Sequence, residues 1–292
     1  MQNLIVKLIL SLNELFPITP VHMEIMRAKR TTQDYHFWEY TEIKRVYKEF
    51  EPYWDLENKT ILDVGCGLGG KLPFYIEHGA KKVVGIDLRP FSILSGNQVL
   101  IKRGVSMIEL AIADGTRLPF ADNTFDALIS INVLEHVETP ILFLSECKRV
   151  LRPGGYFYLY FPPFYSPWGA HLDGWINFPW PHLFFSERVL TRAAALIEER
   201  MRYNEQFIPS ARVPWSELHE LYELNRLTIY RFIKLVNEVD FKVLLFRLLP
   251  FGHHLLRKNM LGRILLTVLR AACRLPIINE VITTKVVCVL TK

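Results

Sequence analysis

The chain has few cysteines, little net charge and no apolar run long enough to span a bilayer. Its four cysteines lie far apart in 292 residues and form no CxxC pair, which argues against disulfides or a structural zinc and for a reducing, cytoplasmic compartment. We therefore expect no metal. A net charge of +5, with no dense basic patch interleaved with aromatics, argues against a nucleic-acid substrate.

Apolar residues, in contrast, are abundant. They make up 50% of the chain, ample for the core of one enlarged domain or two. The stretch Met1–Leu15 is rich in them but lacks a basic start and a small-residue cleavage site, so it does not fit a secretory signal. It is also too short to cross a bilayer. We expect a helix that packs on the rest of the protein, with contact to a membrane surface as the alternative.

The most informative stretch runs from residue 60 to 70 and reads Thr-Ile-Leu-Asp-Val-Gly-Cys-Gly-Leu-Gly-Gly. A short apolar strand ends in Asp63, Gly65 and Gly67 open a turn, and a helix follows from Leu72. Such a unit cradles a nucleotide-like ligand, because glycines let the backbone turn sharply and approach it. The stretch also satisfies G-x-G-x-x-G, so alone it does not separate dinucleotide binding from other uses.

Acidic residues end the next two predicted strands. The strand Lys82–Asp87 places Asp87 22 residues after Gly65, where a carboxylate would lie beside a ribose. A third strand, over 106–112, is followed by Asp114. Each acid alone could be an ordinary turn residue, but the carboxyl ends of parallel strands share one edge of the sheet. We therefore expect these acids to meet there and bind a ligand.

Further strands and helices alternate along the chain, which predicts an α/β fold with a mainly parallel sheet. Apolar runs and helical spacing give strands over 125–130, 156–161, 241–249 and 284–290, and helices over 141–151 and 226–240.

In order and spacing, these residues resemble the class I S-adenosylmethionine-dependent methyltransferases, particularly the small-molecule branch that includes the ubiquinone-type enzymes. The resemblance covers about residues 58–162 through the segments LDVGCGLGG, VVGIDL, ADGTRLPFADNTFD and VLEHV…LRPGG. A nicotinamide dehydrogenase would explain the glycines and Asp87, but not Asp114 or the turn from Asn132 to His136.

The resemblance implies a Rossmann-like, seven-stranded, mostly parallel sheet with helices on both faces and an antiparallel last strand. It also implies S-adenosylmethionine as cofactor. Asp63 would orient the amino-acid end of the cofactor, while Gly65 and Gly67 would let the backbone approach it. Asp87 would accept hydrogen bonds from the ribose diol, and Leu88 would pack on the adenine. Asp114 would accept from the adenine amino group, and Asn132 would contact the methionine part.

The domain organisation follows from where the chain departs from this pattern. We expect an N-terminal helical extension over 1–50 and a methyltransferase domain over 51–292. The domain would carry a lid or substrate insertion at about 162–225 and a basic helical insertion at about 250–280. Residues 162–185 include eight aromatics and five prolines, too many prolines for a long helix. An irregular cover over the site, with helices near 186–202 and 215–224, is favoured over a purely supporting mini-core.

Methyl transfer is an in-line displacement, so positioning and exclusion of water supply most of the acceleration. An oxygen or nitrogen acceptor can also require a general base. His171 is the first candidate, because Asp173 could be its partner. His182 and Tyr165 are the others. We expect His136 to brace a loop instead.

These features predict a methyltransferase of EC class 2.1.1 acting on a small molecule, with a lipid-like or glycan-linked acceptor among the options. The alternative is a non-catalytic, cofactor-binding scaffold in a membrane-associated pathway. Between Leu255 and Leu275, one helical face carries Arg263, Arg270 and Arg274, opposite Leu261, Leu265, Val268 and Ala272. That pattern fits core packing or peripheral contact with a membrane.

Overall fold

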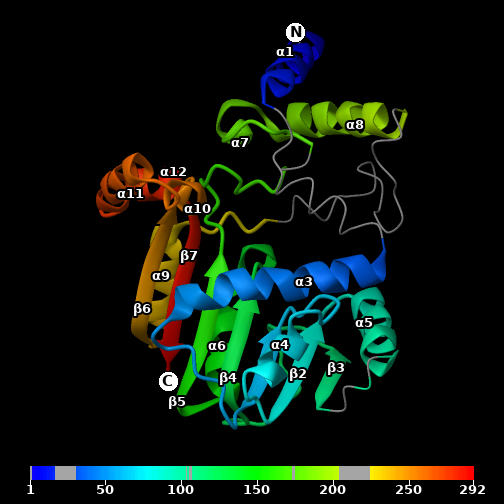
Figure 1. The fold of residues 1–292 in the computed structure, drawn as a ribbon, viewed down its shortest axis with the longest axis vertical. Coiled ribbons are helices and arrows are strands. Elements are labelled where there is room, and N and C mark those ends of the chain that lie inside the picture. The colour runs from blue at the N-terminus through cyan, green and yellow to red at the C-terminus, as the bar shows by residue number, and fades with distance from the viewer. Residues whose placement is uncertain (1, 17–30, 103, 105–106, 173–174, 204–223) are drawn as a thin grey trace.

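The computed structural model describes residues 2–16, 31–102, 104, 107–172, 175–203 and 224–292 (Figure 1). Its centre is a seven-stranded sheet in the order β3-β2-β1-β4-β5-β7-β6. β7 runs antiparallel to both β5 and β6, and the other neighbours are parallel, which confirms the fold class. The strands are β1 Thr60–Val64, β2 Lys82–Asp87, β3 Ile108–Ile112, β4 Phe125–Ile131, β5 Leu151–Phe161, β6 Lys242–Pro250 and β7 Thr283–Thr291.

Both faces of the sheet are buried, because alternate side chains of each strand point to opposite sides. Leu62 and Val64 of β1 join one core, whereas Ile61 joins the other. The first core is covered by α6 Pro140–Val150 and α9 Ile229–Glu238. The second is covered by α3 Thr32–Val46, η1 Tyr47–Phe50, α4 Leu72–Glu77 and α5 Pro90–Lys102.

β5 starts earlier than the sequence predicts. The sequence predicts a helix over 141–151 and a strand over 156–161. The strand in fact begins at Leu151, directly after α6, and its pairing with β4 is irregular between Phe125 and Ala127. Gly154 has a φ of +74°, a conformation that glycine adopts without steric cost. The dipeptide Gly154-Gly155 therefore shapes an irregular strand start and not a loop.

The N-terminal helix packs on the segment that follows β5. α1 Gln2–Leu15 lies beside α8 Glu187–Tyr203, beyond the carboxyl ends of the parallel strands (Figure 1). The buried side chains of this third core come from α1, the loop before α8 and α8 itself, and include Val6, Ile9, Leu10, Trp175, Ile176, Leu190 and Ala193. Asn13 adds a hydrogen bond to the Trp175 carbonyl at 2.9 Å. This packing agrees with the main interpretation of the N-terminal stretch. α8 matches the helix expected near 186–202, whereas the one expected near 215–224 lies outside the described residues.

The insertion between the last two strands holds three helices, α10 His253–Leu256, α11 Met260–Ala272 and α12 Ile278–Ile282. The side chain of Asn259 accepts a hydrogen bond from the Gly262 amide at 2.7 Å and so caps α11. The Phe251 amide donates to the Ile282 carbonyl at 2.8 Å, so the insertion leaves and rejoins the sheet at one point. Among the described residues, the helices are all too short or too polar to cross a membrane.

Candidate cofactor and acceptor site

The side chains of Val133 and Glu39 lie close to the glycine loop after β1. Gly65 and Gly67 have φ values of +80° and +62°, which side chains with a Cβ rarely adopt. A Cβ on Gly65 would lie 2.3 Å from a methyl carbon of Val133, and one on Gly67 would lie 2.4 Å from Oε1 of Glu39. The positive φ therefore favours glycine at both positions, and at Gly65 the contact with Val133 also leaves no room for a side chain.

Asp63 lies beneath this loop and is completely buried. The Tyr75 hydroxyl donates to its Oδ2 at 2.7 Å, while its Oδ1 has no hydrogen-bond partner. Burial raises the pKa of Asp63, and the nearby Lys71 ammonium opposes that shift. A buried carboxylate oxygen without a donor is costly in a protein interior. It fits a site that receives a donor from a ligand or an ordered water.

Asp87 and Leu88 occupy the end of β2. The Gly67 amide donates to Oδ2 of Asp87 at 3.0 Å, and the Arg89 amide donates to Oδ1 at 2.9 Å. Nε of Arg89 also donates to Oδ1, at 3.3 Å, so both lone pairs of Oδ1 are used. Oδ2 keeps one lone pair for a further hydrogen bond. Leu88 is 66% exposed, which leaves an apolar surface beside the acid. This pairing suits the ribose and adenine of a nucleoside.

Asp114 is exposed at the end of β3. Its Oδ1 accepts hydrogen bonds from the amide and the hydroxyl of Thr116, both at 2.8 Å. This local turn fixes the backbone that carries the carboxylate. The structure thus places the acids of the first three strands along the same edge of the sheet, where the sequence predicted them (Figure 1).

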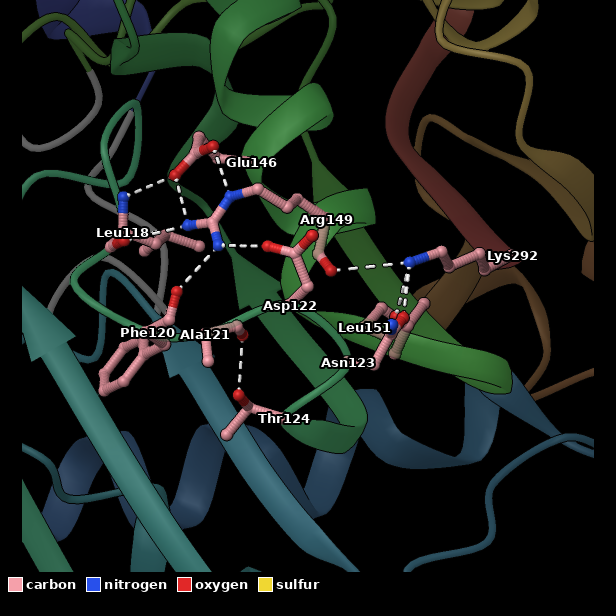
Figure 2. A network of polar contacts seen from close by, with 10 residues as sticks. All are labelled: Leu118, Phe120, Ala121, Asp122, Asn123, Thr124, Glu146, Arg149, Leu151 and Lys292. Carbon is pink, nitrogen blue, oxygen red and sulfur yellow. Dashed lines mark hydrogen bonds and ion pairs between the residues drawn. The ribbon is translucent and has the colours of Figure 1, made fainter.

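An arginine on α6 braces the segment that follows Asp114 (Figure 2). Arg149 donates to the carbonyl oxygens of Leu118 and Phe120 at 2.9 and 2.7 Å, and to the carboxylate of Glu146 at 2.7 Å. Glu146 also accepts from the Leu118 amide at 2.8 Å, and its pKa is lowered mainly by the hydrogen bond from Arg149. The segment ADGTRLPFADNTFD therefore forms a loop that Arg149 holds in place, and this loop carries Asp114.

Two charged residues at the glycine loop have no role that the sequence predicts. Oε2 of Glu39, on α3, accepts from the Gly70 amide at 2.9 Å, and burial raises the pKa of Glu39 to about 7. Burial disfavours the charge of Lys71, but the carboxylates of Asp63 and Glu39 outweigh it and raise the Lys71 pKa. The position of Lys71 next to the loop was visible in the sequence, but without an assigned role. Nothing in the pattern of α3 distinguishes Glu39 from the acids around it.

Asn132 follows β4 at the methionine side of the expected site. Its φ is +56°, and its amide donates to the Tyr160 carbonyl at 2.7 Å. Its side-chain oxygen accepts from the Lys285 ammonium of β7 at 2.5 Å. The backbone of Asn132 is thus held by β5, and its side chain is oriented by Lys285 of β7. The sequence does not predict this contact with Lys285.

The next residues along the chain bring an acid and two imidazoles together. Glu135, in η2 Leu134–His136, is buried, and neither of its carboxylate oxygens has a hydrogen-bond partner. Its Oε1 lies 3.7 Å from Nε2 of His171, which follows β5 and has a φ of +53°. Burial raises the pKa of Glu135 to about 7, against the opposing charge of Lys285. An acid that titrates near neutrality is suited to proton transfer.

His136 completes this cluster. Its ring centroid lies 4.9 Å from that of His171 in an edge-to-face arrangement. Although part of His136 is exposed, the loss of water around its ring lowers its pKa to about 4, and the charges of Arg89 and Lys285 add to this shift. His136 is therefore neutral at pH 7. The bracing role expected from the sequence stays a prediction.

Glu135, His136 and His171 also form a possible metal-ligand set, since one ligand atom from each lies within 4.8 Å of the others. Two imidazoles and a carboxylate are donors that zinc and non-haem iron accept. The set is split between η2 and the segment that follows β5, so no local spacing in the sequence indicates it. The Lys285 ammonium, which favours the ionised form of Glu135, also repels a cation there. The absence of a metal stays a prediction.

The other candidate bases lie elsewhere in the segment between β5 and α8. Nε2 of His182 is 2.9 Å from the Phe164 carbonyl, and burial lowers the pKa of His182. Tyr165 is partly exposed and its ring packs against that of Phe164. Asp173, the expected partner of His171, lies outside the described residues. Of the three candidates, His171 is the one that the structure brings to the buried acid.

The fold and the acids at its edge define a class I methyltransferase domain. Residues 62–159 match the family described as "Methyltransferase domain", a stretch that includes the glycine loop, Asp87, Asp114 and Glu135. This part of the chain is accordingly a class I S-adenosylmethionine-dependent methyltransferase domain, and S-adenosylmethionine is its cofactor.

Among similar proteins, a sterol 4-C-methyltransferase of Caenorhabditis elegans is 35% identical over 105 residues, which are 36% of this chain and 31% of that protein. Cycloartenol-C-24-methyltransferase 1 of Oryza sativa subsp. japonica is 32% identical over 131 residues, 43% of this chain and 38% of that protein. The matches thus span about a third of the length of these relatives. The solved structure of geranyl diphosphate methyltransferase in complex with S-adenosylmethionine aligns with a TM-score of 0.51 and 14% identity, covering 89% of this chain and 87% of that one. At this identity the likeness shows the fold alone.

Proposed function

We propose that the chain is an S-adenosylmethionine-dependent methyltransferase whose acceptor is a small, lipid-like molecule with an ionisable O–H or N–H group. The observation that supports this most directly is the buried Glu135, 3.7 Å from the lid residue His171 and three residues after Asn132. A proton-accepting pair thus follows the strand end to which the methionine part of the cofactor is assigned. The sterol-methylating relatives are consistent with an apolar acceptor but do not identify it.

The residues at the edge of the sheet fit the cofactor, which supplies an electrophilic methyl group when bound. Asp87 would accept hydrogen bonds from the ribose hydroxyls, and the exposed Leu88 would pack on the adenine. Asp114 would accept from the adenine amino group. The unpartnered Oδ1 of Asp63 would receive a donor from the amino-acid end, directly or through water.

On the acceptor side, His171 would take the proton from the attacking group. Glu135 would orient the imidazole and stabilise its positive charge, as an acid paired with a catalytic histidine commonly does. The lid packs its buried aromatic residues against α1 and α8, so it can exclude water from the reacting groups. Positioning and desolvation then supply the remaining acceleration.

The competing function is a scaffold that binds the cofactor without turnover. Labelled S-adenosylmethionine, incubated with the protein and with host lipid, quinone, sterol and glycan extracts, distinguishes the two. We expect transfer of label to a compound in an apolar fraction, lost in Gly67→Arg together with cofactor binding. His171→Asn should lose transfer but keep binding by calorimetry, with Glu138→Gln as an exposed control. Binding without transfer to any fraction would support the scaffold.

A further inference from the structure

The helix α11 turns an apolar stripe away from the protein. Gly262, Leu266 and Cys273, which share one side of the helix, are buried against the domain. On the outward side five large apolar residues are 48–76% exposed: Met260, Leu261, Ile264, Leu265 and Val268. Core packing accounts for the first side only. The outward stripe needs another explanation, because monomeric proteins rarely expose contiguous apolar surface of this kind.

A neighbouring residue is held outward at a conformational cost. Ile277, just before α12, has a φ of +72° and is 80% exposed. Its ψ is −49° and the Ile278 amide donates to the Pro276 carbonyl at 2.9 Å, a tight three-residue turn that is strained. A β-branched residue at a positive φ is an outlier, and strain of this kind is concentrated at functional segments. The turn presents a bulky apolar side chain to solvent a few residues after α11.

The charge of the insertion indicates what covers this surface. Residues 251–279 contain five basic residues and no acidic one, and all five are exposed: Arg257, Lys258, Arg263, Arg270 and Arg274. The first acid, Glu280, is engaged by the Ile229 and Tyr230 amides of α9 at 2.9 Å each. An apolar stripe flanked by arginines complements an anionic lipid surface, which offers hydrocarbon below and negative headgroups above.

The insertion is also joined to the lid. The indole nitrogen of Trp180, in the lid, donates to the Val281 carbonyl of α12 at 2.9 Å. The Trp180 ring lies 5.8 Å from that of Phe251, at the start of the insertion. α11 and the lid both lie beyond the carboxyl ends of the parallel strands (Figure 1). A surface bound by α11 would therefore meet the same end of the molecule that receives the acceptor.

We propose that the outward face of α11, with Ile277, is a docking surface for an anionic bilayer, and that the enzyme takes its acceptor from that bilayer. Uptake of the acceptor from the bilayer rests on the function proposed above. The docking itself is supported by the exposed apolar stripe, the strained Ile277 and the excess of basic residues in the insertion. The helix lies in the interface and does not cross it, in keeping with its length of 13 residues.

Vesicle flotation of the full chain tests the docking. We expect binding to phosphatidylcholine vesicles that contain phosphatidylglycerol, and little binding to phosphatidylcholine alone or at high salt. Leu261→Ser combined with Ile264→Ser and Val268→Ser should abolish binding. Replacing Arg263, Arg270 and Arg274 by Gln should weaken it by on the order of 100-fold, about fivefold for each basic residue. Because every substituted side chain is exposed, the melting temperature and cofactor affinity should stay unchanged.

The matched control removes exposed apolar residues from elsewhere, as Ile101→Ser on α5 and Leu142→Ser on α6, and should bind vesicles like the parent chain. The docking proposal is overturned if the parent chain fails to float with anionic vesicles at low salt, or if the α11 variant binds as well as the control. It is equally overturned if light scattering shows a dimer that the same substitutions dissociate. Methyl transfer to detergent-dispersed extracts, measured in parallel, reports on the enzyme function independently.

Discussion

The backbone amide of Gly67 donates a hydrogen bond to the carboxylate of Asp87 at 3.0 Å, which joins the glycine loop after β1 to the end of β2. The acid assigned to the ribose is thus also a support of the loop that approaches the cofactor. Its two roles can be separated by substitution, because an amide side chain can still accept from Gly67 but has only one acceptor oxygen.

Asp87→Ala should weaken S-adenosylmethionine binding by about 1.5–3 kcal/mol, the range for hydrogen bonds to a charged group. Asp87→Asn should lose less, since it can keep the contact with the Gly67 amide. Isothermal titration calorimetry measures both. Unchanged affinity in Asp87→Ala, or tight binding of NADH with no response to S-adenosylmethionine, would refute the cofactor assignment.

Glu135 should make folding stability depend on pH. Its pKa is raised from 4.5 to about 7 in the folded protein, so the folded state holds a proton that the unfolded state releases between these values. The contribution of Glu135 to stability therefore falls as pH rises from about 4.5 to 7 and is constant above. Relative to the parent chain, Glu135→Gln should gain roughly 3 kcal/mol over this interval.

Chemical denaturation at several pH values tests this difference. Glu238→Gln, an exposed acid on α9, is the control and should track the parent chain throughout. A constant difference between Glu135→Gln and the parent would mean that the acid titrates normally.

Methyl transfer should rise with pH through about 7, because Glu135 must be ionised to stabilise a protonated His171. His171→Asn should lower kcat by about 10²–10⁴-fold, the usual contribution of a general base, with little change in the KM for S-adenosylmethionine. Steady-state kinetics with the acceptor found in the extract assay provide both numbers. A rate that survives in His171→Asn would indicate that proximity alone suffices.

Removal of divalent metal should leave methyl transfer unchanged, since the Glu135–His171 pair acts without an ion and Lys285 repels one. The measurement compares the protein before and after dialysis against a chelator. Loss of activity that Zn²⁺ or Mn²⁺ restores would instead assign Glu135, His136 and His171 as ligands. A cobalt absorption spectrum that changes in Glu135→Gln would confirm that assignment.

Arg149→Ala should loosen the loop that carries Asp114 without touching the cofactor. Several hydrogen bonds are lost and two partly buried backbone carbonyls lose their charged donor, so we expect a loss of stability of about 2 kcal/mol and weaker cofactor binding. Arg231→Ala, on the exposed side of α9, provides the control. Thermal unfolding and calorimetry check the two effects. Weaker stability with full cofactor affinity would show that the brace serves the fold alone.

The cofactor side could be predicted from the sequence because its signals are local. A glycine pair after an apolar strand and an acid at the end of the next strand each follow from one stretch of chain, and parallel topology then brings them to one edge. Leu88 and Asn132 are assigned by resemblance to these same segments, and their roles stay predictions.

The acceptor side could not be predicted in this way. Glu135 gains its significance from the approach of His171, 36 positions later, and Glu39 from the packing of α3 on the glycine loop. Neither contact produces a periodic pattern in the sequence that could predict it. The sequence did reveal the amphipathic character of residues 255–275, but not which side faces the domain, because that depends on how α11 is set on the end of the sheet.

The single point at which the insertion leaves and rejoins the sheet has an evolutionary consequence. With the Phe251 amide bonded to the Ile282 carbonyl at 2.8 Å, β6 and β7 are already closed before α10 begins. The entropic cost of closing a loop grows only slowly with its length. Lengthening or deleting the insertion between β6 and β7 therefore has a small energetic effect and leaves the strand register intact. Under the docking proposal, evolution can therefore change or remove the membrane-binding helix without a change in the cofactor site. A variant in which a short hairpin replaces the insertion would make the same change by design.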